Sequence, residues 1–379
     1  MRAAWAVLLA AAAGPLPARD PEGISVRLSA GGPRRSASVA VRGTVRVSSP
    51  DGRSLFRAGE DLDVEFEADA PGRLRVDGED TAGAPAILRP APGRGFRLEG
   101  RAYSGDLRVS AAADGTLVLQ NLLPLPEYLE GVLAAELFPD SPPEALRAQA
   151  VLARSFALIH LDDLTDDPGL HQAYRGRPSP ACAAVVADAV RATEGLRLVD
   201  GAGGPLPNYW YHSTCGGRTA DASFVFGVPA CAAYAGVPCG RCGDSKYYTW
   251  ESEVPEEDVR RAMRFGSAVA RVEIGARSID GRVLTFRATA AGGTVRYVQA
   301  LQVRLALGAN RLRSTLLGSV EAVPGPGGRP RAFRFRGRGW GHGVGLCQVG
   351  ACALAREGRA ASEILSFYYP GTRLARPGR

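Results

Sequence analysis

One carboxylate falls on the apolar face of an expected helix. Segment 125–137 carries apolar residues at helical spacing, and Glu136 occupies the next position on that face. Burial raises the pKa of a carboxyl because desolvation penalises its charge, and the negative end of the helix dipole acts in the same direction. A carboxyl that keeps its proton near neutral pH can serve as a general acid. The alternative is a structural Glu136 that pairs with Arg147 or Arg154, or that is solvated at a frayed helix end.

A second candidate is the loop Gly339-Trp-Gly-His-Gly-Val-Gly345, which alternates glycine with larger side chains. Alternate glycines let a backbone approach a ligand closely, here at Gly341 and His342. The N-terminus of the helix expected after the loop offers N–H groups to an oxygen-rich ligand. The glycine spacing is not that of a dinucleotide- or phosphate-binding loop. The alternative is a tight strand–turn–helix connection that His342 caps.

Nucleophile chemistry is a further alternative. Ser213 and Cys215 lie near His212 in the segment 209–217, Tyr-Trp-Tyr-His-Ser-Thr-Cys-Gly-Gly, but no GxSxG motif surrounds the serine. A dyad of Cys215 or Cys347 with a histidine would make a thiol hydrolase of peptide cross-links. The aromatic residues of this segment are typical of a core, although Tyr and Trp beside a cleft also stack on sugars.

The chain has seven cysteines, and an odd number leaves at least one outside any disulfide. Cys239 and Cys242 form a CxxC in a glycine-rich loop that needs a staple to stay ordered. Export favours a disulfide, and a structural zinc with Cys215, Cys231 or His212 is the alternative. The CxxC lacks the βαβ setting of a thioredoxin-like site, so a redox role is not expected.

The elements around these residues predict an α+β fold. Residues 20–120 alternate apolar and polar side chains between Gly, Pro and Asp clusters, and Asp114-Gly115 is a hairpin signal. Several short helices packed on antiparallel strands follow. The expected helices are 125–137, 141–160, 183–193, 255–265, 346–357 and 362–368. The expected strands are 24–28, 38–47, 63–67, 107–110, 116–120, 196–199, 208–212, 268–274, 283–288, 294–298 and 332–336. The expected domains are a signal peptide at 1–18, a β-rich region at 19–95 and a catalytic domain at 96–379 with a β-rich subregion at about 255–325.

Composition limits the class of protein. The 379 residues are 45% hydrophobic and 22% charged, which excludes a disordered tail and an integral membrane bundle. Residues 1–18 have the pattern of a signal peptide, with a buried N-terminal helix as the alternative, and no other stretch is long enough to span a membrane. We therefore expect export to the periplasm, cell wall or extracellular space. The net charge of +7 suits an anionic wall polymer better than nucleic acid, because no basic run with interleaved aromatics occurs.

Several segments together resemble one family, the stage II sporulation protein D family, which also includes amidase-enhancer proteins. The resemblance covers roughly residues 100–375, and the combined order of its motifs is highly specific. The segments are Leu123-Pro-Leu-Pro-Glu-Tyr-Leu-Glu-Gly-Val-Leu-Ala-Ala-Glu136, Pro143-Glu-Ala-Leu-Arg-Ala-Gln-Ala-Val-Leu-Ala-Arg154, Tyr211-His-Ser-Thr-Cys-Gly-Gly-Arg-Thr219, Gly337-Arg-Gly-Trp-Gly-His-Gly-Val-Gly345 with Gln348, and Tyr369-Pro-Gly-Thr372.

The resemblance implies a peptidoglycan lytic transglycosylase. Such an enzyme cleaves between N-acetylmuramic acid and N-acetylglucosamine and leaves a 1,6-anhydro end, in sporulation members on glycan stripped of its stem peptides. Glu136 matches the family's catalytic glutamate. The positions expected to bind substrate in the same cleft are Arg154, Tyr211, Ser213, Gly341, His342 and Gln348. The alternative is a non-catalytic activator that binds glycan or a cell-wall amidase.

The resemblance has departures: Cys347 stands where a small polar residue is expected, and the loop after the second helix differs. Family members that hold zinc carry Cys and His ligands in the loop after the second helix. Here the loop 161–174 contains no Cys and only His171, with His160 just before it. The implied reaction requires no cofactor, and a structural zinc remains an alternative at Cys239 and Cys242.

Overall fold

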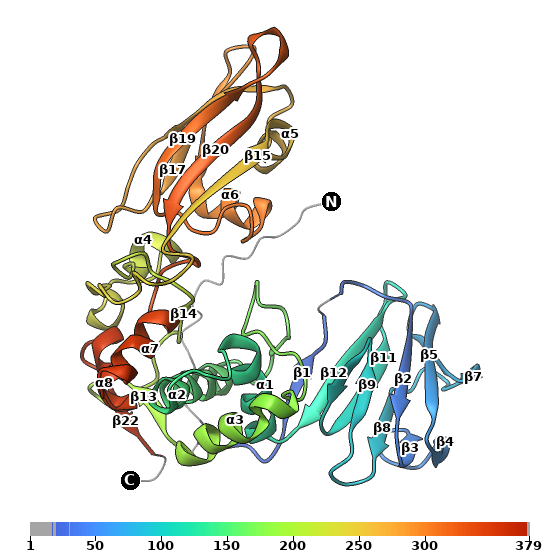
Figure 1. The fold of residues 1–379 in the computed structure, drawn as a ribbon. Coiled ribbons are helices and arrows are strands. Elements are labelled where there is room, and N and C mark those ends of the chain that lie inside the picture. Colours follow the sequence, from blue (N-terminus) through green and yellow to red (C-terminus); the bar gives the residue numbers. More distant parts are fainter. Residues whose placement is uncertain (1–16, 18–19, 30, 377–379) are drawn as a thin grey trace. The chain divides into compact units, whose positions relative to one another are not determined.

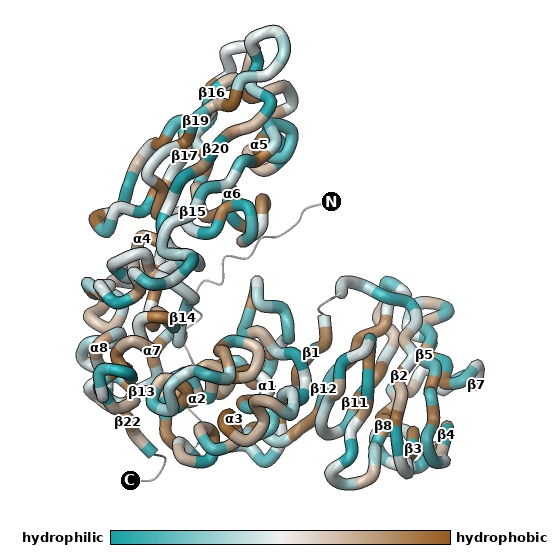
Figure 2. The backbone as a smooth tube through the Cα atoms, viewed as in Figure 1, coloured by the Kyte–Doolittle hydropathy of each residue, from teal (hydrophilic) through white to brown (hydrophobic). Residues whose placement is uncertain are grey.

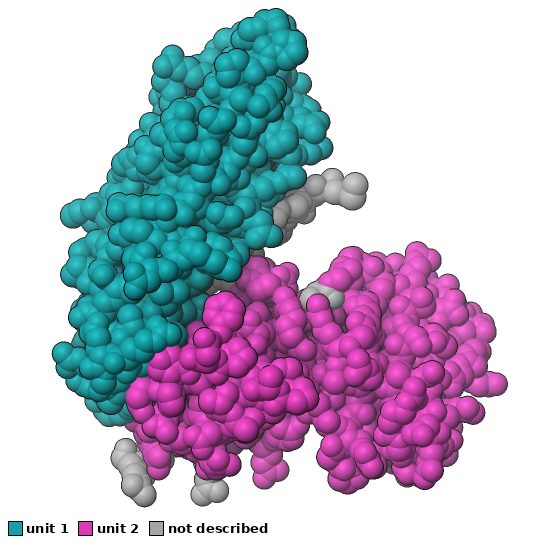
Figure 3. Space-filling model, viewed as in Figure 1, with its two compact units in different colours: residues 1–13, 198–374 teal, residues 14–197, 375–379 magenta. Residues whose placement is uncertain are grey.

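The computed structural model describes residues 17, 20–29 and 31–376 and has the expected α+β fold (Figure 1). The expected signal peptide lies outside the described residues apart from Pro17. The chain divides into two compact units, which Figure 3 colours separately. We call them the N-terminal unit, which ends at Arg197, and the C-terminal unit, Leu198–Leu374.

The N-terminal unit begins with two six-stranded sheets, of order β1-β12-β11-β8-β3-β4 and β10-β9-β2-β5-β6-β7. Hydrophilic and hydrophobic residues alternate along most of these strands (Figure 2), and β5 and β12 each turn one face to the core. In the hairpin of β11 and β12, Asp114 Oδ1 accepts the Thr116 N–H at 3.0 Å and Gly115 has a φ of 75°. This confirms the turn expected there. The strands are β1 Ile24–Arg27, β2 Ser36–Val41, β3 Thr44–Ser48, β4 Leu55–Glu60, β5 Asp63–Ala70, β6 Arg73–Val76, β7 Glu79–Asp80, β8 Ala86–Pro90, β9 Phe96–Leu98, β10 Arg101–Tyr103, β11 Asp106–Ala111 and β12 Leu117–Leu123.

Two details differ from the sequence-based expectations. The β-rich region continues through the expected strands 107–110 and 116–120 to Leu123, past the expected domain boundary at residue 95, because β9 pairs with β2, β11 with β8 and β12 with β1. β9 and β10 are each three residues long, too short to show a period. The segment 38–47, expected as one strand, turns at Gly43, whose φ is +86°, and forms β2 and β3.

Three helices complete the N-terminal unit and confirm the expected positions: α1 Leu125–Glu136, α2 Pro143–Ile159 and α3 Pro180–Ala192. Each has proline at its first or second position, where the missing N–H costs nothing. The apolar stripe of α1 is fully buried, with Leu125, Leu129, Val132 and Leu133 at most 1% exposed.

In the C-terminal unit, two three-stranded antiparallel sheets share a core with two short helices. The sheets are β15-β20-β19 and β16-β17-β18, and Phe286, Phe333 and Phe335 are fully buried among them. The elements are β15 Thr249–Pro255, α5 Glu256–Ala262, β16 Val269–Ile274, β17 Thr285–Ala290, β18 Val295–Gln299, α6 Ala300–Leu307, β19 Leu317–Pro324 and β20 Pro330–Arg338, with a 3-10 turn at Pro326–Gly328. Of these, β15, α6 and β19 were not expected from the sequence.

The rest of the C-terminal unit contains the histidine and cysteine motifs. β14 (Tyr211–His212) pairs in parallel with β21 (Leu346–Cys347), which brings together two segments far apart in the sequence. The neighbouring elements are β13 Arg197–Val199, α4 Ala222–Phe226, a 3-10 turn at Ala232–Tyr234, α7 Gln348–Arg356, α8 Ala361–Tyr368 and β22 Arg373–Ala375. No helix within the described part of the chain combines the length and apolar character needed to cross a bilayer.

Candidate active site

Glu136 is the last residue of α1, and its side chain is half-buried. The backbone N–H of Ala173 donates to Glu136 Oε1 at 2.8 Å. Ala173 belongs to the loop between α2 and α3, so the loop holds the carboxylate against the end of the helix. Arg147, a partner considered from the sequence, forms an ion pair with Glu144.

Close packing fixes this loop against α1. A Cβ at Gly131 would lie 2.5 Å from the Gly176 carbonyl oxygen and 2.6 Å from the Tyr174 ring, so only glycine permits the approach. Tyr174 donates its hydroxyl to Asn121 Oδ1 at 2.8 Å, and Gln172 donates to the Tyr128 hydroxyl at 3.3 Å. The position of Ala173 beside Glu136 is therefore set by side chains from β12 and α1.

The Arg154 side chain is buried and engaged within the N-terminal unit, so the structure assigns it a structural role, and its predicted role in substrate binding stays a prediction. Its side chain is 2% exposed, and its guanidinium donates to the carbonyl oxygens of Thr193 at 2.6 Å, Val190 at 3.3 Å and Leu196 at 3.3 Å. Asp20 lies 3.4 Å from its Nε. Burial lowers the pKa of Arg154, and Asp20 opposes that shift. In this structure the cation neutralises and caps the carboxyl end of α3.

The loop after α2 contains a group of possible metal ligands. The ligand atoms of His160, Asp163 and His171 lie within 4.8 Å of one another. Burial lowers the pKa of both histidines, and neutral imidazole is the form that binds metals. His160 Nε2 is buried and has no hydrogen-bond partner among the described residues. Two imidazoles and a carboxylate fit a zinc ion, although they differ from the Cys and His set that the resemblance implies. Sequence reasoning missed Asp163.

In the C-terminal unit, β14 and β21 position the other predicted residues. Tyr211 is half-buried and pairs in register with Leu346. Ser213 directly follows β14; its carbonyl oxygen accepts the Val349 N–H at 3.1 Å, and its Oγ lies 3.3 Å from Thr214 Oγ1. Gln348 is buried at the start of α7. Tyr211, Ser213 and Gln348 thus come together around one short parallel pair of strands.

The Gly-His-Gly loop lies against β14. A Cβ at Gly341, whose φ is +116°, would lie 2.7 Å from His212 Cβ. The rings of His212 and His342 lie 5.6 Å apart, centroid to centroid. The backbone N–H of Gly341 donates to the Arg313 carbonyl oxygen at 2.9 Å. Because this N–H already has a partner within the protein, it is not the group that Gly341 would use to bind a sugar.

Both histidines are held neutral. Burial, together with the positive charges of the nearby Arg282 and Arg304, lowers the pKa of His212 to about 3. The Nδ1–H of His212 donates to the Val344 carbonyl oxygen at 3.0 Å. Burial and the neighbouring His212 lower the pKa of His342 well below its usual range. His342 Nδ1 accepts the Val344 N–H at 3.1 Å, which places the proton of the neutral ring on Nε2.

Replacing Gly341 by alanine is expected to destabilise the protein by at least about 2 kcal/mol, because the new methyl combines a strained φ with a clash against His212. Gly358→Ala is the matched control: Gly358 also has a positive φ, +85°, but nothing lies within 4 Å of its Cβ position. Urea unfolding followed by circular dichroism measures both. Equal losses in the two variants would contradict the close contact.

The expected CxxC lies in a larger cluster. The sulfur atoms of Cys215, Cys239, Cys242 and Cys347 all lie within 4.8 Å of one another, and all four residues are buried. Cys231, considered as a partner from the sequence, is exposed and outside this group. Cys347 was considered only as a nucleophile, and the pairing of β14 with β21 brings it to the CxxC.

The predicted site residues belong to both units. Glu136 and Arg154 lie in the N-terminal unit, and the other predicted residues lie in the C-terminal unit: Tyr211, Ser213, Gly341, His342 and Gln348. That Glu136 and His342 line one cleft stays a prediction.

Comparison with known protein families and proteins gives matches over both units. A family model described as stage II sporulation protein matches residues 113–199, which include α1, α2 and Glu136, and a model of a domain of unknown function matches residues 242–345. An uncharacterized protein of Brachyspira hyodysenteriae is 30% identical over 297 residues, 73% of each chain. The stage II sporulation protein D of Bacillus subtilis is 26% identical over 275 residues, 67% of this chain and 75% of the relative. That of Bacillus amyloliquefaciens is 26% identical over 270 residues, 66% and 73% of the two chains. With these matches, in addition to the helices and motifs described above, the chain belongs to the stage II sporulation protein D family.

Proposed function

We propose that this protein is an exported peptidoglycan-remodelling enzyme, a lytic transglycosylase that cleaves the bond between N-acetylmuramic acid and N-acetylglucosamine. Its named relatives are stage II sporulation proteins, which supports a role related to sporulation or the cell wall. The observation that carries the proposal is the position of Glu136, at the end of a helix whose other face residues are buried and beside a backbone donor. The proposed substrate is the glycan strand, including strands stripped of stem peptides.

The reaction needs one group that gives and then takes a proton. The Glu136 carboxyl protonates the glycosidic oxygen as the bond to the anomeric carbon breaks. The 6-hydroxyl of the same muramic acid then attacks that carbon, and the Glu136 carboxylate accepts the hydroxyl proton. The products are a 1,6-anhydro-muramic end and a free hydroxyl on glucosamine, so no water is consumed. This is why one carboxyl can replace the pair that ordinary glycosidases use.

Other residues in each unit would orient the acid or bind the sugar. The Ala173 N–H holds one oxygen of Glu136, which restricts the direction in which the carboxyl can present its proton. In the C-terminal unit, Tyr211 and Ser213 would bind sugar hydroxyls, together with the neutral ring of His342. The excess of basic residues, +7 overall, would favour association with anionic wall polymers.

Mass spectrometry of glycan digests tests this proposal. Purified protein is incubated with intact peptidoglycan and with glycan from which an amidase has removed the stem peptides, and the ends of the products are identified. Ends of 1,6-anhydro-muramic acid are the expected result. Reducing ends would instead mean hydrolysis of the glycan, and loss of peptide cross-links would mean a thiol hydrolase. An absence of products, together with stimulation of an added cell-wall amidase, would favour the activator function.

A further inference from the structure

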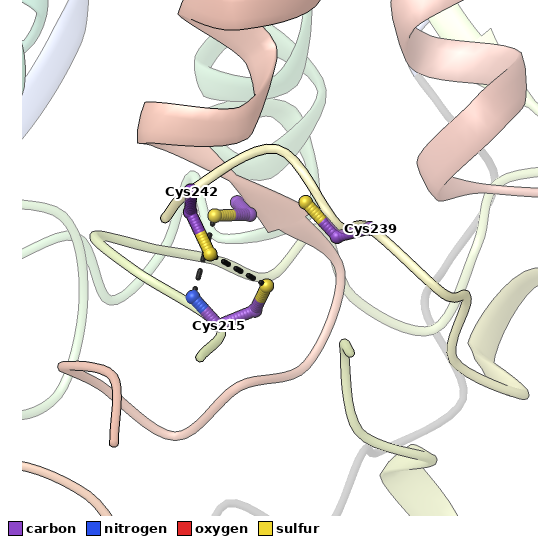
Figure 4. A group of neighbouring side chains, drawn as sticks. Cys215, Cys239 and Cys242 are labelled. Carbon is purple, nitrogen blue, oxygen red and sulfur yellow. Dashed lines mark hydrogen bonds between the residues drawn. The ribbon is translucent and has the colours of Figure 1, made fainter. Parts of the chain in front are cut away.

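Four cysteines converge in the interior of the C-terminal unit, outside the residues proposed to act on glycan. Cys215 follows β14, Cys239 and Cys242 form the CxxC, and Cys347 precedes α7. Figure 4 shows Cys215, Cys239 and Cys242 with their sulfur atoms turned toward one another, and the sulfurs of Cys215 and Cys242 lie 3.3 Å apart. All four side chains are at most 1% exposed. In a tetrahedral zinc tetrathiolate the sulfurs lie about 3.8 Å apart, which the cluster approximates.

Backbone and hydroxyl groups surround these sulfurs with hydrogen-bond donors. Cys347 Sγ accepts the N–H groups of Cys215 at 3.3 Å and Gly350 at 3.4 Å. Cys215 Sγ accepts the Gly217 N–H at 3.4 Å, and the Tyr368 hydroxyl lies 3.2 Å from Cys239 Sγ. Such donors stabilise sulfur that carries negative charge, as metal-bound thiolate does.

Glycine is required where α7 meets the cluster. A Cβ at Gly350 would lie 2.6 Å from Cys239 Sγ and 2.1 Å from the Tyr368 hydroxyl oxygen. Gly350 therefore lets the start of α7 approach the CxxC closely enough for its N–H to reach Cys347.

A buried cation accompanies the cluster. Arg282 is 1% exposed, and its Nη2 donates to the Cys215 carbonyl oxygen at 3.0 Å. Its Nη1 is buried and has no hydrogen-bond partner within residues 20–29 and 31–376. The Asp280 carboxylate lies 3.9 Å from Arg282 Nε, and Arg304 is a second buried cation. The single negative charge of Asp280 therefore does not neutralise the two positive charges. Four thiolates around a divalent metal carry a net negative charge, which offsets the cost of burying these guanidinium groups.

We propose that Cys215, Cys239, Cys242 and Cys347 bind one structural Zn²⁺ through their four sulfur atoms. A disulfide would join two of the sulfurs and leave two thiols buried beside it, whereas zinc uses all four. The metal would tie together the end of β14, the CxxC loop and the start of α7, which carry Ser213 and Gln348. The proposal does not rest on the proposed glycan chemistry.

Metal analysis of the full chain tests the proposal. We expect about one zinc per chain in protein purified without added metal, and loss of that zinc in Cys239→Ser and Cys347→Ser. Cys231→Ser is the control, because Cys231 is an exposed cysteine outside the cluster, and it should keep the metal. Replacement of zinc by Co²⁺ should produce the visible absorption bands of a tetrahedral thiolate site.

A measurement on the unmodified protein covers the case in which the serine variants do not fold. Titration of the native chain with a mercurial reagent should release the zinc only as the four buried cluster thiols react, after the exposed Cys231 has been modified. The proposal is overturned if the protein contains no zinc, if peptide mapping finds a disulfide between any two of the four cysteines, or if folded Cys347→Ser and Cys239→Ser keep their zinc. Glu136→Gln should keep the metal, so failure of the glycan chemistry and failure of the zinc site are distinguishable.

Discussion

Glu136→Gln is expected to lower the rate of formation of anhydro-ended products at least roughly 100-fold, because glutamine keeps the shape of the side chain and removes the transferable proton. The Ala173 N–H can still donate to the amide oxygen, so the loop between α2 and α3 should stay in place. Product release from peptide-stripped glycan, measured at saturating protein, gives the rate. Circular dichroism should show an unchanged fold.

Glu130→Gln is the matched control for this substitution. Glu130 lies on the same helix but on a different face, and burial raises the pKa of its carboxyl. Its replacement removes one carboxyl from α1 without touching the proposed acid, so the rate should stay within a few-fold of wild type. A Glu136→Gln protein that degrades glycan at the wild-type rate would refute the lytic mechanism.

Arg154→Met is expected to destabilise the protein by about 3–5 kcal/mol, the usual cost of removing one partner from a buried charged network. Methionine fills most of the volume, but the carbonyl oxygens of Thr193, Val190 and Leu196 lose their donor. Urea unfolding monitored by circular dichroism measures the loss.

The control is Arg191→Met on α3, where Arg191 is 74% exposed and pairs with Asp188 at 2.8 Å. Its loss should change stability by less than about 0.5 kcal/mol. A substrate-binding Arg154 would show a different signature, namely a raised KM with unfolding unchanged. That outcome would support the substrate-binding role expected from the sequence.

Local patterns in the sequence were sufficient for the elements around Glu136, the proposed catalytic residue. The apolar stripe of Leu125, Leu129 and Val132 predicted α1, proline predicted the helix starts, and Asp114-Gly115 predicted the β11–β12 hairpin. These signals lie within a few residues of one another, so periodicity and turn chemistry reveal them. The helix α4 had comparable signals, Asp221 as N-cap and Gly227 in the left-handed region, and could have been found in the same way.

Other features depend on residues that only the tertiary structure brings together. The sequence by itself determined the α+β class, the helix that carries Glu136 and the presence of a CxxC. It did not determine that Arg154 caps α3, because the guanidinium binds backbone carbonyl oxygens of Val190 and Thr193. Every residue has a backbone carbonyl, so the side-chain pattern cannot show which ones Arg154 reaches. The sequence also could not place Cys347 beside Cys239 and Cys242. Cys347 reaches the cluster because β21 pairs in parallel with β14, and each of these strands has only two residues. Such short strands carry no period, and long-range pairing depends on how the whole unit packs rather than on neighbouring residues.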